Sequence, residues 1–124
     1  MHNHSTDGFT IIELIVVIVV IGILAAIAIP RYISLNSRAN TQSTNNVAAA
    51  LAAASAANFA ARTANVAVGA TITNCTGIPA LLPGAALPAG YTVTSTALSN
   101  GVGANCTLTG PGGAVTFRGI GITP

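Results

Sequence analysis

The sequence is poor in charge, and charged residues make up only 5% of its 124 residues. It contains no lysine, and its two histidines, His2 and His4, both lie at the start of the chain. Beyond residue 8 the one acidic residue is Glu13. General acid–base and nucleophilic catalysis both require positioned titratable groups. These shortages therefore predict that the chain is not an enzyme.

The same shortages argue against most bound ligands. Calcium sites need several carboxylates, and the two cysteines do not form a Cys-x-x-Cys metal motif. The GPGG stretch at 110–113 lacks the lysine of a phosphate-binding loop. The four Lys and Arg residues are all arginines, and they are dispersed along the chain rather than clustered. We therefore expect no metal, no cofactor and no nucleic-acid partner.

Aliphatic side chains, in contrast, are abundant. No polar side chain occurs between Leu14 and Ile29, and with Phe9 the apolar segment is about 21 residues long, enough for a helix to cross a bilayer core. Many of these residues are β-branched and form helices poorly in water. In lipid, however, a single segment must satisfy its own backbone hydrogen bonds as a helix.

Glu13 is out of place in this apolar segment. A carboxylate at membrane depth costs roughly 2.5–3.5 kcal/mol and is a functional candidate by default. If the chain were cut between Gly8 and Phe9, the new α-amine at Phe9 would lie within a helical turn of Glu13. A neighbouring subunit could offer the same amine.

The stretch GFTIIEL at 8–14, the aliphatic run and the Pro30-Arg31-Tyr32 step resemble the class III signal of type IV pilins and of type II secretion pseudopilins. The resemblance implies that a prepilin peptidase cleaves after Gly8 and N-methylates Phe9. It also implies that Glu13 pairs with an amine during assembly. Gly22 and Pro30 match the positions where the family softens or kinks its helix. The leader at 1–8 departs from the family pattern because it has no lysine or arginine.

A single helix is predicted from about Phe9 to about Ala64, kinked near Pro30. Its second half is rich in alanine, the best helix former. Asn36–Asn45 is polar and is expected to be the exposed part of the helix. Apolar residues recur after Pro30 at three- and four-residue intervals, and they are Ile33, Val47, Ala48, Leu51, Ala52, Ala54, Ala57, Phe59, Ala60 and Ala61. We expect the alanines beyond Asn46 to pack on the chain's own sheet, with helix packing between subunits as the alternative. Residues 9–35 are expected to pack between subunits.

The C-terminal half predicts a small antiparallel sheet of three or four strands. Its candidate strands alternate apolar and polar residues and are separated by glycine-rich turns. Tyr91, Val93, Leu108, Val115 and Phe117 are expected to face the helix. Residues 77–90 are broken by prolines and predict an irregular loop that is either packed down or covered by a neighbour. The four candidate strands are ATIT at 70–73, YTVTST at 91–96, CTLT at 106–109 and AVTFR at 114–118.

Cys75 and Cys106 lie in the part of the chain expected to be exported. An even cysteine count in a small exported domain indicates a disulfide, and two cysteines allow only one intramolecular pairing. Free or metal-binding thiols are the alternative. Two N-x-T sequons, at Asn74 and Asn105, overlap these cysteines.

The predicted fold is thus α+β, the pilin fold, in which a long N-terminal helix packs on a small antiparallel sheet. The predicted parts are a leader at 1–8, a hydrophobic transmembrane and assembly helix at 9–32, and a head domain at 33–124. The resemblance implies an inner-membrane precursor with a cytoplasmic N-terminus. It also implies partners in the prepilin peptidase, the assembly machinery and further copies of the chain.

The predicted function is that of a structural subunit of an extracellular type IV pilus used for adhesion, motility or surface attachment. A pseudopilin of a type II secretion system is the alternative. Major pseudopilins typically bind calcium through aspartates in the C-terminal region, and this chain has none there, which favours the pilus. A membrane-anchored binding module is a third hypothesis.

Overall fold

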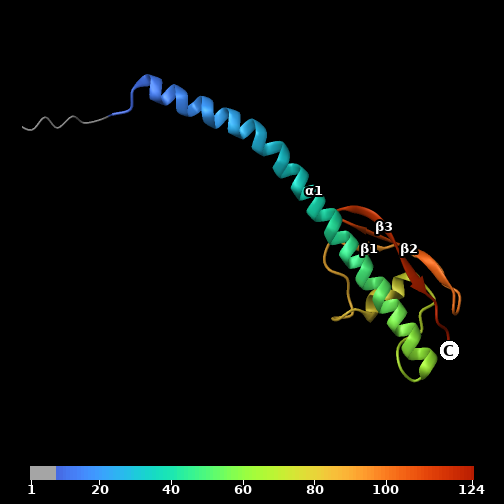
Figure 1. Ribbon diagram of the computed structural model, residues 1–124. Helices are drawn as coiled ribbons and strands as arrows, with labels where there is room; N and C mark the ends of the chain where they lie inside the picture. Colours follow the sequence, from blue (N-terminus) through green and yellow to red (C-terminus); the bar gives the residue numbers. More distant parts are fainter. Residues whose placement is uncertain (1–7) are drawn as a thin grey trace, which may run out of the picture. The chain divides into compact units, whose positions relative to one another are not determined.

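The computed structural model describes residues 8–124, so the His2–His4 pair and all of the expected leader except Gly8 lie outside the described residues. The chain divides into two compact units, the first ending at Asn36 and the second spanning Ser37–Pro124. Within residues 8–124 the elements are one α-helix, one 3-10 helix and three strands. Figure 1 shows the course of the chain with α1 and the strands labelled.

Helix α1 runs from Ile11 to Ala64 without interruption, which confirms the single long helix predicted from the sequence. Pro30 lies inside it, and helical structure continues on both sides of the proline. The predicted kink at Pro30 stays a prediction.

The first half of α1 is apolar on all sides and exposed. This half is long and apolar enough to cross a membrane, and none of that stretch is buried within the described chain. Even its least exposed large aliphatic side chain, Val17, is 45% exposed. Within the described residues the first unit therefore has no hydrophobic core of its own.

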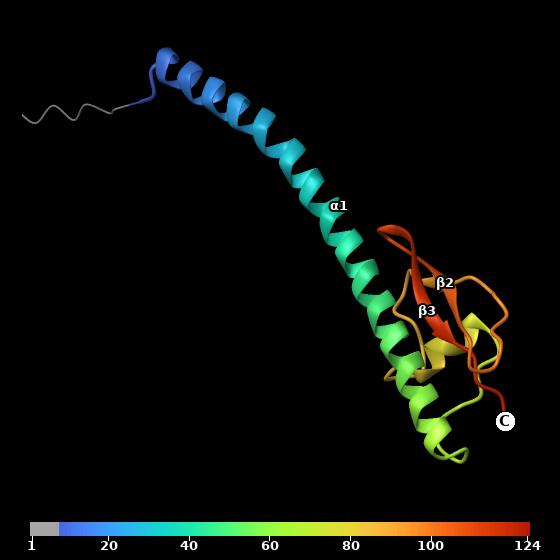
Figure 2. The ribbon, with the colours of Figure 1, turned by 45° about the vertical axis from the view of Figure 1, so that its right-hand side comes forward.

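The second unit contains a three-stranded antiparallel sheet in the order β1-β2-β3. The strands are β1 (Thr92–Val93), β2 (Gly103–Gly110) and β3 (Gly113–Ile120). Strands β2 and β3 form a hairpin in which Gly110 pairs with Gly113. Figure 2 shows this hairpin lying along the second half of α1.

Of the four predicted strands, one is absent from the structure and another is shorter than the sequence pattern. Residues 70–73 form no strand, because only Ile72 makes a ladder contact, an isolated bridge to Ile122. Of residues 91–96 only Thr92 and Val93 form a strand, since the backbone then turns toward residue 74 and Thr96 accepts a hydrogen bond from the Cys75 N–H. Alternation therefore predicted the strands at 106–109 and 114–118 correctly but was wrong at 70–73, because a strand also needs a pairing partner.

The proline-rich segment is more regular than predicted. Its first part belongs to a 3-10 helix, η1, at Cys75–Leu81, so the expectation of no regular element was wrong there. The Asn74 side chain caps η1 by accepting the Thr76 N–H. The expected packing is confirmed, because Ile78 is fully buried and Leu81 packs against the core.

The core lies between the sheet, η1 and the second half of α1. Leu108 and Phe117 are buried in it as predicted, and Tyr91, Val93 and Val115 pack against it. Its buried apolar members are Ala48, Leu51, Ile72, Cys75, Ile78, Leu98, Cys106, Leu108, Phe117 and Ile122.

The buried stripe of α1 contains more polar side chains than the sequence predicted. Its members follow each other at three- and four-residue spacing, and they are Thr44, Ala48, Leu51, Ser55 and Asn58. Thr44 was predicted to be exposed, whereas it is completely buried. The predicted stripe was also wrong at Ala57 and Ala60, which are exposed.

The polar side chains of the buried stripe, Thr44, Ser55 and Asn58, form hydrogen bonds with backbone groups that no neighbouring strand pairs with. The Gly112 N–H donates to Thr44 Oγ1 at 3.1 Å, and the Ile120 N–H donates to Ser55 Oγ at 2.8 Å. Asn58 exchanges two hydrogen bonds with the backbone of Ala70. The two hydroxyls therefore fix both ends of β3 to the helix, because a buried N–H without a partner is costly.

A disulfide joins Cys75 of η1 to Cys106 of β2, and both cysteines are completely buried. Gly119 of β3 provides the space beside it. A Cβ at position 119 would lie 2.6 Å from Cys106 Sγ and 2.7 Å from Ile78 Cδ1. The sheet can approach the disulfide closely only because residue 119 has no side chain.

We predict that Gly119→Ala lowers the free energy of unfolding by about 1–3 kcal/mol, because the added methyl group overpacks the core. Gly77→Ala is the matched control, since a Cβ there meets its nearest neighbour at an ordinary 3.4 Å. Denaturant unfolding of both variants measures the difference. Equal stabilities would contradict the close packing described here.

Candidate functional site

The start of α1 holds the charged candidate residue, Glu13, in a defined position. The Thr10 N–H donates to Glu13 Oε2 at 2.9 Å, and the Glu13 N–H donates to Thr10 Oγ1 at 3.3 Å. This reciprocal pair is a capping box, in which the residue before the helix and its third residue satisfy each other's backbone groups. It explains why α1 begins at Ile11 rather than at the predicted Phe9.

The capping box gives Glu13 a role within a single chain. Sequence reasoning attributed this carboxylate entirely to pairing with an amine and overlooked Thr10. The Thr-x-x-Glu spacing at 10–13 was a sufficient sequence signature for the cap. Only Oε2 of the carboxylate is used by the Thr10 N–H, so the cap orients Glu13 without occupying both of its oxygens.

The predicted cleavage and methylation residues lie directly before this cap. Gly8 and Phe9 precede the helix, and Phe9 is 84% exposed. An exposed, non-helical peptide bond at this point is accessible to a peptidase. Gly22 lies inside α1, and nothing comes within 4 Å of the position a Cβ would take there. Gly22 therefore offers a flat, open place on the helix surface.

The structure brings the candidate residues together in two places. Thr10 and Glu13 meet at the start of α1, and Cys75 and Cys106 meet in the core of the second unit. In the part of the chain that the structure describes, no group of three or more His, Cys, Asp or Glu side chains could hold a metal ion. The chemistry at the start of the helix is therefore that of one carboxylate, backbone amides and apolar surface.

A family model described as the prokaryotic N-terminal methylation motif matches residues 3–29. This range contains Gly8, Phe9, Glu13 and Gly22. It ends at Ile29, just before Pro30.

Several known proteins match part of the chain. The type IV narrow pilus major component PilA5 of Thermus thermophilus is 53% identical over 47 residues, which are 38% of this chain and 40% of that protein. The type IV major pilin PilA of Myxococcus xanthus is 56% identical over 36 residues, 29% of this chain and 16% of that protein. The type IV major alpha-pilin of Moraxella bovis is 47% identical over 61 residues, 48% of this chain and 38% of that protein.

The chain thus spans less than half the length of each of these relatives. No solved structure matches it. The N-terminal motif and the named relatives show that part of the chain is similar to type IV pilins.

The capping box predicts how two Glu13 variants differ. Glu13→Ala removes the acceptor of the Thr10 N–H, so exchange of that amide should accelerate about tenfold, in line with the loss of a helix cap. Glu13→Gln keeps an amide oxygen in place and should exchange nearly as slowly as the parent chain. NMR hydrogen exchange of the full chain in detergent micelles measures both. Equal exchange in the two variants would show that Glu13 does not cap α1.

Proposed function

We propose that the chain is a structural subunit of a type IV pilus, held in the inner membrane as a precursor and assembled into an extracellular filament. Residues 9–32 are its membrane and assembly segment, and residues 33–124 are its head. The observation that carries this proposal is an exposed apolar helix bearing the N-terminal methylation motif and joined to a folded unit.

The free energies of burial favour placing this helix first in lipid and afterwards in a bundle of helices. Covering one Val, Leu or Ile side chain contributes about 1.5–3 kcal/mol. Placing a glutamate at membrane depth costs roughly 2.5–3.5 kcal/mol. A few of the exposed aliphatic side chains therefore outweigh Glu13, which does not prevent burial. Its cost instead favours arrangements in which the carboxylate meets a cation.

Cleavage between Gly8 and Phe9 would create that cation. Hydrolysis turns the Phe9 amide nitrogen into an α-amine, and N-methylation leaves it basic. The cap already points the Glu13 carboxylate toward the first residues of the chain and leaves one oxygen without a use in the cap. An amine of an adjoining subunit can bind this oxygen and neutralise a charge that is costly alone in an apolar bundle.

A pilus is favoured over a secretion pseudopilin by the named pilins and fimbrial proteins among the relatives. The absence of any acidic residue after Glu13 agrees with this preference. The buried disulfide suits a head that is exposed outside the cell, where disulfides persist. Adhesion, motility and surface attachment are the proposed uses of the filament.

Glu13→Gln separates charge pairing from helix capping. It should insert, be cleaved and keep its helix start, yet enter filaments at least tenfold less often, because a neutral amide does not neutralise the amine. Quantifying sheared filaments against the membrane pool measures this ratio. Thr10→Val is the complementary control, since it weakens the cap and keeps the charge. Wild-type incorporation of Glu13→Gln would end the pairing hypothesis.

Intact-mass analysis of purified filaments tests processing directly. The expected product begins at N-methylated Phe9 and is two hydrogens lighter than the reduced chain, because Cys75 and Cys106 are joined. Reduction and alkylation supply the matched control for the disulfide. A filament product that still begins at Met1 would rule out the proposed precursor cleavage.

A further inference from the structure

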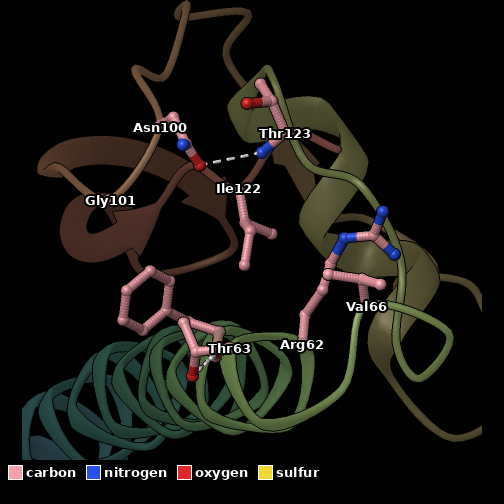
Figure 3. A pocket seen from close by; sticks show the side chains of 8 residues that line it. Arg62, Thr63, Val66, Asn100, Gly101, Ile122 and Thr123 are labelled. Atoms are coloured by element: carbon pink, nitrogen blue, oxygen red, sulfur yellow. Dashed lines mark hydrogen bonds between the residues drawn. The ribbon is translucent and has the colours of Figure 1, made fainter.

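A cavity of about 310 Å³ opens at the end of α1, and all of its lining residues belong to the second unit. Phe59 and Arg62 of α1 and Val66 just beyond it line one side, and Asn100 and Ile122 line the other. Figure 3 shows the side chain of Ile122 and the extended side chain of Arg62 among those that line the cavity. None of these residues has a part in the assembly described above.

The walls of the cavity are mainly apolar. Ile122 is buried, and Phe59 is half-buried against the core. Val66 is 71% exposed at the mouth of the cavity. Apolar walls with a few polar groups, and a volume near the lower end of the roughly 300–1,000 Å³ range, are typical of small-molecule sites.

Arg62 gives the cavity its charge. Its Nε is shielded from solvent and has no hydrogen-bond partner among residues 8–124. Asn100 carries the one side-chain carbonyl among the lining residues, and its Oδ1 accepts the Thr123 N–H at 3.0 Å. Since buried donors are normally paired, an unpaired guanidinium N–H at a cavity indicates a missing acceptor.

The chain cannot supply an acidic side chain to Arg62 from its own head. No aspartate or glutamate follows Glu13 in the sequence, so the head of a second copy offers none either. No carboxylate side chain of the head can therefore accept a hydrogen bond from Arg62.

We propose that this cavity binds a compact organic carboxylate. The carboxylate accepts charge-assisted hydrogen bonds from Arg62, and the body of the ligand packs on Phe59 and Ile122. Arginine suits this role because its planar guanidinium matches a carboxylate. A bare inorganic anion would use the charge and leave the apolar walls uncovered.

The test uses the full chain in detergent micelles and follows the Arg62 Nε–H and the Gly101 amide by NMR. The probes are benzoate, glucuronate and inorganic phosphate. They compare an aromatic carboxylate, a sugar carboxylate and an anion that has no organic group. We expect a saturable shift with benzoate or glucuronate in the millimolar range. Phosphate should bind at least tenfold more weakly. Absence of saturation with both carboxylates, or equal binding of phosphate, would overturn the proposal.

Three variants localise the binding. Arg62→Gln should weaken it about tenfold or more, because it removes the charge-assisted hydrogen bonds. Val66→Phe keeps Arg62 and should also weaken binding by filling the mouth, which preserves the test if Arg62→Gln folds poorly. Arg118→Gln removes the same charge from an exposed site on β3 outside the cavity and should bind normally. Equal loss in Arg118→Gln would show that general electrostatic attraction explains the shifts.

Discussion

The first half of α1 presents aliphatic side chains on all sides, and within residues 8–124 nothing covers them. Exposed apolar surface of this extent requires lipid or other helices as its neighbours. The Glu13 carboxylate opposes burial of this surface, and Thr10 holds it at the start of the helix. The proposed cleavage at Phe9 places a cation where the carboxylate points. In the proposed filament the apolar surface would drive association, and the charge would select which arrangements are stable.

The head is stabilised differently, because hydrogen bonds to the backbone and one disulfide hold its small core together. Thr44 and Ser55 anchor the two ends of β3 to α1. The Cys75–Cys106 disulfide ties η1 to β2, and Gly119 leaves the space that it needs. A core this small benefits from a cross-link, which reduces the conformational freedom of the unfolded chain. The head therefore does not depend on the apolar half of the helix for its own packing.

Much of this architecture was predictable because it is encoded locally. The apolar run and the alanines specify α1, and alternation at 106–109 and 114–118 specifies the hairpin. The buried polar side chains were not predictable, because the groups that satisfy Thr44 and Ser55 lie 68 and 65 residues away in the sequence. At the candidate site, motif spacing singled out Gly8, Phe9 and Glu13, whose roles in processing and pairing stay predictions, while the Thr10 cap was overlooked. The surroundings of Arg62 depend on long-range packing, which no local pattern records.

A cryo-electron microscopy reconstruction of the purified filament tests the central claim most directly. The account predicts that the apolar halves of α1 pack together in the filament interior. It also predicts that each Phe9 α-amine lies within about 4 Å of the Glu13 carboxylate of an adjoining subunit, the distance of an ion pair. A filament in which Glu13 contacts only its own Thr10, with every neighbouring amine remote, would contradict it.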